Sequence, residues 1–485
     1  MNLLKKTLLL SLFLGSCSTQ KNLGKNINNE VEQSFLSSDQ SISSSAPSDN
    51  WWQEFNDPTL NKLIELGLSN NKDLKSASLA IETSRQLNNL DIAKLLPTGS
   101  ASLGRQRFSS PGFGPNGIGY DIYQATFDAA WELDFFGKNL DRYRAGKLRF
   151  LKESQLYKAS ALRVTSEIAQ NYIELKRVQK QLANLQKIEQ LTKELNLITS
   201  KKEKNGVASK TDLHRSEIEA NNSSSELISA QTEEKIINYR LAVLIGVMPE
   251  KMPEILNRQN QKEINDYYSG IVPVGLKSDI LKRRPDIIAA EYEIDAADFD
   301  RSAQFKEFFP SFNLTATVGG GSKDFGEVLR DSTNVKDIRG QIKLPIFSIG
   351  QLIAEYKISK AKAKEAIISY EKTVLAAIEE SESQITRYGN SLKVEDNAQK
   401  SLAAQQKILR IDQNKKRFGV ISKEDLVRSE IATLGTENQF VRKKADSLVN
   451  LVALHKSIGG GFAGYQINFE NDRVFMSEEK TEAEK

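Results

Sequence analysis

The chain has 485 residues, of which only 39% are hydrophobic and 27% are charged. This composition argues against several round cores and suits long helices with narrow apolar stripes. The net charge is +4, or +2 once Lys5 and Lys6 leave with a leader peptide, and this balance gives no indication of a nucleic-acid partner.

The N-terminus predicts export followed by lipidation. Residues 1–16 read as a signal peptide, with two lysines, an apolar run over 8–14 and the small pair Gly15-Ser16. Cys17 follows at the cleavage point, in a Leu-Gly-Ser-Cys sequence that resembles a lipobox. Because Cys17 is the only cysteine, it cannot form an internal disulfide, and we predict that it is acylated. The alternative is an ordinary cleaved signal with an incidental cysteine.

Residues 17–49 are predicted to be a lipidated tether, since they are rich in Ser, Asn and Gln and show no periodic pattern. Ser18 follows the cysteine in place of the aspartate associated with inner-membrane retention, which favours the outer membrane.

The rest of the chain contains two copies of one sequence unit, separated by a constant number of residues. Within 206–218, ten of thirteen residues recur 213 positions later, between 419 and 431. We therefore predict two structural repeats, 50–246 and 276–459. A linker over 247–275 joins them, and a tail over 460–485 follows.

Each repeat is predicted to start with a helix, over 59–94 and 277–307, followed by one β-hairpin. Apolar and polar residues alternate over 123–135 and around Ala101 and Leu103 in the first repeat. In the second repeat they alternate over 311–318 and 337–346. Strict alternation predicts strands with one apolar and one polar face. Loops rich in Gly and Pro or in polar residues, 109–120 and 322–335, would join the strands.

Two interpretations of these hairpins remain open. In a soluble sandwich the apolar face is core, whereas in a membrane barrel it faces lipid and the polar face lines a lumen. Four strands cannot close a barrel, and lipid tolerates no open sheet edge. A membrane barrel therefore requires several chains, and three chains would supply twelve strands.

The remaining sequence is predicted to be helical. Two long helices, 147–205 and 351–418, are each followed by a shorter one, 209–245 and 422–457. A helix of about 65 residues is about 100 Å long.

The turn between each long and short helix is where the repeats are most alike. Gly206 and Gly419 suit the left-handed position that ends a helix. The polar residues predict capping boxes that open the next helix: Ser209 with Asp212, and Ser422 with Asp425. A tight turn does not explain the repeated apolar pair Val207 and Val420. Apolar residues at an exposed tip favour a docking contact.

The sequence does not predict an enzyme, a metal site or a cofactor. It has two histidines, His214 and His455, and no cysteine pair. Residues 112–117 match the letters G-x-G-x-x-G, but they lie in a hairpin loop and include Pro115, so they fail the structural context of a nucleotide site.

Several further motifs occur between residues 50 and 462: WWQEF at 51–55 with Asp57-Pro58, WELDFFG at 131–137, PVGL at 273–276, RRPDI at 283–287, FFPS at 308–311 and GGGF at 459–462. Together they resemble the TolC family of outer-membrane factors, in its OprM/NodT branch of efflux lipoproteins. The resemblance implies a mainly α-helical trimer. A shared twelve-stranded β-barrel in the outer membrane would continue into a long α-helical tunnel across the periplasm.

The resemblance also implies how the chain works. An equatorial collar would be formed by residues 18–58, 247–275 and 459–485. Helical tips at 204–213 and 417–426 would dock onto a periplasmic adaptor (membrane fusion) protein that links the duct to an inner-membrane pump. The implied adaptor contacts are Gly206, Val207, Ser209, Gly419, Val420 and Ser422.

Family members close the periplasmic end with rings of aspartate, and Asp425 falls where one such aspartate lies. Arg428 stands one helical turn later, where a second aspartate would be expected. The resemblance thus implies a single Asp425 ring tied to Arg428, or an Asp425 that only caps its helix.

The expected function is a passive outer-membrane duct of a tripartite efflux system of the RND type, exporting drugs or other small toxic compounds. The alternatives are an exit duct for type I protein secretion and a periplasmic coiled-coil scaffolding lipoprotein without a pore. The sequence does not specify the exported compounds, the adaptor or the pump.

Overall fold

The computed structural model describes residues 31, 34–36, 42–45, 47–48, 50–110, 118–256, 262–267, 270–328, 330 and 334–460. The predicted signal peptide, Cys17, the 112–117 glycine match and residues 461–485 lie outside this part. The chain divides into two compact units. The helical unit comprises residues 1–77, 156–287 and 373–485, and the sheet unit comprises 78–155 and 288–372.

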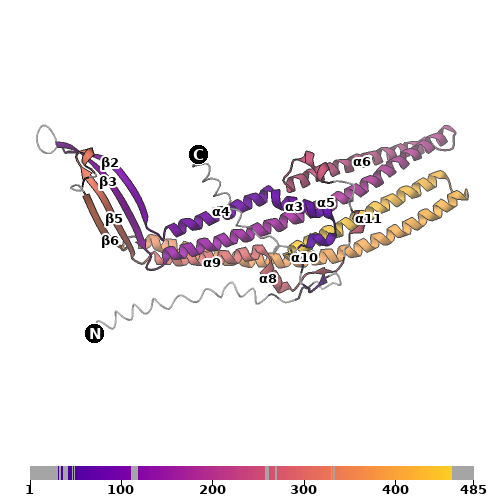
Figure 1. Ribbon diagram of the computed structural model, residues 1–485. Helices are drawn as coiled ribbons and strands as arrows, with labels where there is room; N and C mark the ends of the chain where they lie inside the picture. The colour runs from indigo at the N-terminus through magenta and orange to yellow at the C-terminus, as the bar shows by residue number, and fades with distance from the viewer. Residues whose placement is uncertain are drawn as a thin grey trace. The chain divides into compact units, whose positions relative to one another are not determined.

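The sheet unit contains the two predicted hairpins, β2 (Thr98–Ser110) with β3 (Ile118–Leu133) and β5 (Ser311–Ser322) with β6 (Asn334–Lys343). All three strand pairings are antiparallel, and the order is β2-β3-β5-β6 (Figure 1). The hairpins therefore join through β3 and β5, and β2 and β6 are left as the two edges.

One face of this sheet carries a hydrogen-bonded polar network that crosses three strands. Ser102 of β2 bonds to Thr126 of β3 at 2.7 Å, and Thr126 bonds to Asp128 at 2.9 Å. Thr317 of β5 donates to the same carboxylate at 2.7 Å. Polar side chains on the predicted polar face therefore hydrogen-bond to one another, which is compatible with a face in contact with water or with a lumen.

The other face is apolar and uncovered. Phe127 lies opposite Ala101 on one side and Val318 on the other. Leu103 is 70% exposed, Phe127 57% and Ile338 80%. These large side chains remain mostly exposed, so this face does not form the core of a soluble sandwich within one chain.

The long helices are α5 (Lys138–Lys204) and α10 (Ile349–Arg417), each followed by a shorter helix, α6 (Lys210–Leu244) and α11 (Lys423–Ser457). Both long helices begin earlier than predicted. α5 runs through Gly146, where a Cβ would lie 2.8 Å from Asn88 Oδ1, so this glycine allows α4 to approach closely. No helix in the described ranges combines the length and the apolar character needed to span a bilayer.

The two helices predicted before the hairpins are each broken. Residues 59–94 form α3 (Pro58–Asn70) and α4 (Lys72–Ala93), because Asn71 leaves the helical region and caps α4. The Asn71 side chain accepts from the Asp73 and Leu74 backbone N–H groups at 2.9 and 3.1 Å.

Residues 277–307 break at the equivalent position of the second repeat. A short turn, η5 (Lys277–Asp279), and α8 (Ile280–Arg283) precede α9 (Pro285–Lys306). Arg284 has ψ 119°, because the following proline ring disfavours the helical conformation of the residue before it. A single unbroken helix was the wrong prediction in both repeats.

A buried polar cluster around Asp57 joins three distant segments of the helical unit. One carboxylate oxygen caps α3, accepting from the Thr59 and Leu60 N–H groups at 2.8 and 3.3 Å. The other accepts from the hydroxyls of Tyr172 on α5, at 2.8 Å, and Tyr267, which follows η4 (Ile264–Asp266). Burial and the Asp57 charge raise the pKa of Tyr172, and burial is also the main cause of the raised pKa of Tyr267, so both stay protonated donors.

His455 of α11 is buried beside this cluster. Its ring stacks on Trp51 of η1 (Trp51–Phe55), with ring centroids 5.3 Å apart. The ring atom Nδ1 has no hydrogen-bond partner among the described residues. Burial lowers the pKa of His455 to about 4, so the ring is neutral near pH 7.

Arg284 connects the inter-repeat segment to α10 and α11. Its guanidinium pairs with Asp286 and with Glu380 of α10, both at 2.7 Å, and donates to the Ser457 carbonyl at 2.8 Å. Nearby, β1 (Ile42–Ser43) pairs in parallel with β4 (Val272–Pro273). Segments predicted to form the collar therefore contact one another within the helical unit.

Candidate docking tips and channel gate

The first tip is the turn between α5 and α6. α5 ends at Lys204, and Gly206 has φ +72°. The Gly206 N–H donates to the Glu203 carbonyl and the Val207 N–H to the Lys202 carbonyl, both at 2.8 Å, which is a Schellman motif. A Cβ at Gly206 would meet nothing within 4 Å, so the left-handed backbone, and not packing, favours glycine here.

The cap that opens α6 is the predicted capping box. The Asp212 N–H donates to Ser209 Oγ, and the Ser209 N–H donates to Asp212 Oδ2, both at 3.1 Å. The second tip has the same pair, Ser422 and Asp425, at 3.1 and 2.9 Å. Gly419 has φ +75°. The predicted turn geometry is confirmed at both tips.

Apolar side chains project from the two turns. Val207 is 74% exposed and Val420 is 70% exposed. Phe418, which sequence reasoning missed, is 80% exposed beside Gly419. Its signal was available, because its helical neighbours at i−4 and i−3 are the polar residues Asn414 and Lys415. The tips therefore present an apolar surface that no described residue covers.

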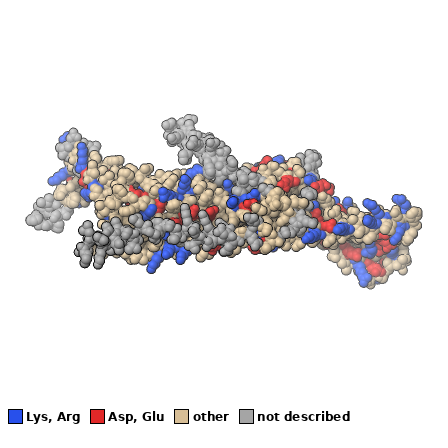
Figure 2. All heavy atoms as spheres, turned by 90° about the horizontal axis from the view of Figure 1, so that it is seen from below, with Lys and Arg blue, Asp and Glu red and all other residues tan. Residues whose placement is uncertain are grey.

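Basic side chains surround this apolar surface. Lys201, Lys204 and Lys210 are exposed at the first tip, and Lys415 and Arg417 at the second. None of the five forms an ion pair with another described residue. Figure 2 shows Lys and Arg side chains gathered at the tip end of the helices, with Asp and Glu beside them. Some of these cations complement the helix C-termini, and together they favour an acidic partner surface.

Ion pairs link the α5–α6 coil to the α10–α11 coil just above the tips. Lys202 of α5 pairs with Glu424 of α11 at 2.7 Å. Arg428 of α11 pairs with Glu424 at 3.1 Å and with Glu219 of α6 at 3.6 Å. Lys423 also pairs with Glu194 of α5. The ion pairs between the coils join residues of different repeats. A local sequence pattern therefore could not predict which residues pair.

Asp425 is exposed, and its carboxylate oxygen Oδ2 accepts the hydrogen bonds of the capping box from Ser422. The hydrogen bonds from Ser422, side chain first and backbone second, hold the pKa of Asp425 below its usual range. Among the described residues, the ion pairs of Arg428 go to Glu424 and Glu219. The Arg428 charge also helps to lower the pKa of Asp425, although no salt bridge joins the two among the described residues. The expected tie between Asp425 and Arg428 therefore stays a prediction.

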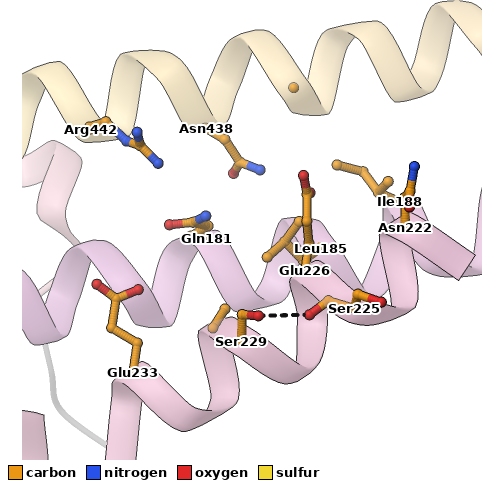
Figure 3. Close-up of a pocket in the computed structure, with 12 residues that line it drawn as sticks. Gln181, Leu185, Ile188, Asn222, Ser225, Glu226, Ser229, Glu233, Asn438 and Arg442 are labelled. Atoms are coloured by element: carbon orange, nitrogen blue, oxygen red, sulfur yellow. Dashed lines mark hydrogen bonds between the residues drawn. The ribbon is translucent and has the colours of Figure 1, made fainter. Parts of the chain in front are cut away.

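A polar recess lies where the two coils face each other. It has a volume of about 660 Å³ between α5, α6 and α11. Figure 3 shows Leu185 of α5, Glu226 of α6, and Asn438 and Arg442 of α11 around it. Gly435, which carries no side chain, also borders the recess. Most of the side chains that line the recess are polar, although Leu185, Ile188 and Ala230 also border it.

No group of three or more His, Cys, Asp or Glu side chains in the described ranges could hold a metal ion. His214 is exposed at the first tip and lies 2.9 Å from Glu217, far from His455 in sequence. The predicted lipidation residue, Cys17, lies outside the described residues.

Comparisons with known proteins agree with this architecture. The family model described as outer membrane efflux protein matches residues 63–247 and 276–460, which are the two repeats. The chain is 28% identical to the probable efflux pump outer membrane protein TtgC of Pseudomonas putida, over 87% of each chain. It is 24% identical to the probable outer membrane lipoprotein SilC of Salmonella typhimurium, over 89% of this chain and 93% of that protein.

Among solved structures, the Campylobacter jejuni CmeC outer membrane channel is similar with a TM-score of 0.79 and 25% identity, over 93% of this chain and 94% of that one. The family consists of channel proteins and not of enzymes. Given the match over both repeats, this chain belongs to the outer membrane efflux protein family and is an efflux channel of the bacterial outer membrane.

Proposed function

We propose that three copies of this chain close into one duct, anchored by lipid at Cys17 and opened when its tips dock onto a periplasmic adaptor. The observation that carries this proposal is the open four-stranded sheet, with one exposed apolar face and two unpaired edges, β2 and β6. Because an open edge is not tolerated in lipid, β6 of each copy has to pair with β2 of the next.

Exposed apolar side chains on the helices support assembly as well. Isoleucines, leucines and valines remain exposed along the shorter helix α6 and the long helix α10: Ile218, Ile228, Ile236, Val243, Ile368, Leu375, Val394, Ile408 and Ile411. In a tube wall each helix packs sideways on its neighbours, so another copy of the chain would cover these rows.

The proposed organisation follows the repeat. Residues 1–16 are the signal peptide and 17–49 the lipidated tether, followed by repeat one (50–246), an equatorial linker (247–275), repeat two (276–459) and an equatorial tail (460–485). SilC is itself named a lipoprotein, which supports acylation of Cys17.

The duct would be passive, with no bond made or broken in this subunit. The tip residues Gly206, Val207, Ser209, Gly419, Val420 and Ser422 would contact the adaptor, which connects the duct to an RND-type inner-membrane pump. Two relatives from Pseudomonas putida are named an antibiotic efflux pump protein and a toluene efflux pump protein, and this supports drugs or other small toxic compounds as the exported class.

The orientation of the chain can be tested with single cysteines. Lys323 follows β5 at the loop end of the second hairpin, and Ser209 lies at the first tip. In intact cells, a membrane-impermeant maleimide should label a Lys323→Cys variant from outside. A Ser209→Cys variant should stay unlabelled until the outer membrane is permeabilised. Equal labelling of the two variants in intact cells would contradict the proposed crossing.

A further inference from the structure

Two arginines extend the apolar face of the sheet at its loop end. Side chains alternate between the two faces of a strand, so Leu103, Arg105 and Arg107 of β2 share one face. Arg105 lies opposite Tyr123 of β3, which shares a face with Phe127. The outward row on β2 therefore changes from apolar to basic within four residues.

Aromatic side chains mark the two limits of the apolar band on this face. Near the helices, Trp131 Nε1 donates to the Leu95 carbonyl at 3.0 Å. Near the loops, Tyr123 packs on Phe325, with ring centroids 5.6 Å apart. Trp131 and Tyr123 are eight residues apart on β3, which is about 20 Å along the membrane normal for a strand tilted by about 40°. That height approaches the apolar band of about 25 Å between the aromatic girdles of membrane barrels.

Arg105 and Arg107 therefore lie at and just beyond the outer girdle. The Arg105 guanidinium is 5.6 Å from the centroid of the Tyr123 ring and pairs with Asp121 at 2.8 Å. Arg107 is exposed and lies opposite Asp121, on which its charge acts, but it forms no salt bridge with another described residue. A charge at this depth is neither in hydrocarbon nor in bulk water, and it can meet the phosphates of lipid headgroups.

The opposite edge of the sheet brings a third cation to the same level. Lys336 of β6 is exposed, shares its face with Ile338 and forms no ion pair with another described residue. Lys336 lies seven residues before the end of β6 at Lys343, and Arg105 lies seven residues after the start of β2 at Thr98. In the proposed ring, where β6 of one copy pairs with β2 of the next, these cations would meet at the seam between two subunits.

We propose that each seam binds the phosphorylated headgroup of an outer-leaflet glycolipid, held by Arg105 and Arg107 of one copy and Lys336 of its neighbour. A guanidinium suits this ligand because its planar fork binds phosphate oxygens in a bidentate manner. The acyl chains of the lipid would lie on the exposed apolar row below, at Leu103 and Ile338. The site rests on the proposed trimer, since β2 and β6 are opposite edges of the sheet within one copy and meet only between neighbouring copies.

The test uses the full-length protein extracted in detergent, with bisphosphorylated lipid A as the probe and native mass spectrometry as the readout. The wild-type trimer should bind the probe. A triple variant that carries Arg105→Gln, Arg107→Gln and Lys336→Gln should bind it at least about tenfold more weakly, which is equivalent to about 1.4 kcal/mol. Asp121→Asn should strengthen binding, because it removes the carboxylate that competes for Arg105.

Arg339→Gln is the matched control. Arg339 lies on the same strand as Lys336 but on the opposite face, where it bonds to Asp337 at 3.0 Å. Its loss should leave lipid A binding unchanged, and an excess of inorganic phosphate should not displace the lipid from wild type.

A triple variant that binds lipid A as tightly as wild type would overturn the site while leaving the proposed duct intact. Displacement by inorganic phosphate would assign the cations to free anions and overturn the lipid assignment. A protein that is monomeric in the same spectra would remove the seam and the proposed duct together.

Discussion

Asp57 is the residue on which the buried centre of the helical unit depends. It caps α3 with one oxygen and accepts from two tyrosine hydroxyls with the other. An Asp57→Ala substitution would remove the acceptor that both hydroxyls and the α3 cap share, and we expect it to lower the free energy of unfolding by about 3–5 kcal/mol. Thermal unfolding of the detergent-extracted protein measures this change.

Asp73→Ala is the control for that substitution. Asp73 is also an aspartate paired across helices, with Arg163 at 3.2 Å, but it is exposed to solvent. Its removal should change the unfolding temperature little, because exposed ion pairs contribute little to stability. Equal losses from both variants would show that burial of Asp57 does not determine its contribution.

His455 gives the helical unit a predictable response to acid. Its pKa is lowered to about 4 by burial, below the ordinary value of 6.5, so the unfolded chain binds a proton more readily than the folded one. The stability from the neutral ring is complete above pH 6.5 and is lost as the pH falls toward 4, by about 3 kcal/mol at most. A His455→Phe variant should therefore show a smaller drop in unfolding temperature between pH 7 and pH 4.5. An identical drop in both proteins would contradict this.

Sequence reasoning succeeds for residues whose partners are local. The capping boxes of Ser209 with Asp212 and Ser422 with Asp425 follow from a spacing of three residues. The partners of Asp57 lie 115 and 210 residues away, and nothing in the sequence pattern pairs them with it. In the sequence, Asp57-Pro58 stands out only as part of a motif that resembles the TolC family.

At the scale of elements, the duplicated tips provide an internal control for the gate. Asp212 and Asp425 make the same capping box, but only Asp425 was assigned to a possible constriction. If Asp425 narrows the channel, Asp425→Ala should raise single-channel conductance in planar bilayers and Asp212→Ala should not. If both variants conduct like wild type, Asp425 is a helix cap and nothing more.

The proposed docking of the tips onto an adaptor should depend on salt and on apolar contact. Val420→Ser should weaken crosslinking to the adaptor, because it removes an exposed apolar group from the turn. Leu197→Ser is the control. It changes another exposed apolar residue, on α5 away from the turn, and should leave crosslinking unchanged. Crosslinking should also decline as salt rises, since Lys415 and Arg417 beside the turn form no ion pair with another described residue. Crosslinking that is insensitive to Val420 and to salt would assign docking to another surface.

The helix breaks show where element-level prediction was incomplete. Pro285 is a visible signal that the preceding residue leaves the helix, yet the segment was predicted as unbroken. Its equivalent at Asn71 has no proline, and only the internal repeat relates the two. Gly146 is the opposite case. This glycine lies inside α5, where it allows close packing of α4 and does not end the helix.

At the scale of the whole molecule, the repeat predicted the architecture because each copy carries the same order of helix, hairpin and long coil. The order of the four strands was not predicted, since the pairing of β3 with β5 joins a strand of the first repeat to a strand of the second. The proposed contacts between copies follow from what a single chain leaves open, namely two sheet edges and rows of exposed apolar side chains.

The mass of the detergent-extracted protein tests the central claim most directly. Native mass spectrometry of the full-length chain should give a single assembly of three copies, because only a closed ring satisfies the edges β2 and β6. A monomer, with its apolar sheet face held in detergent alone, would contradict the proposed duct.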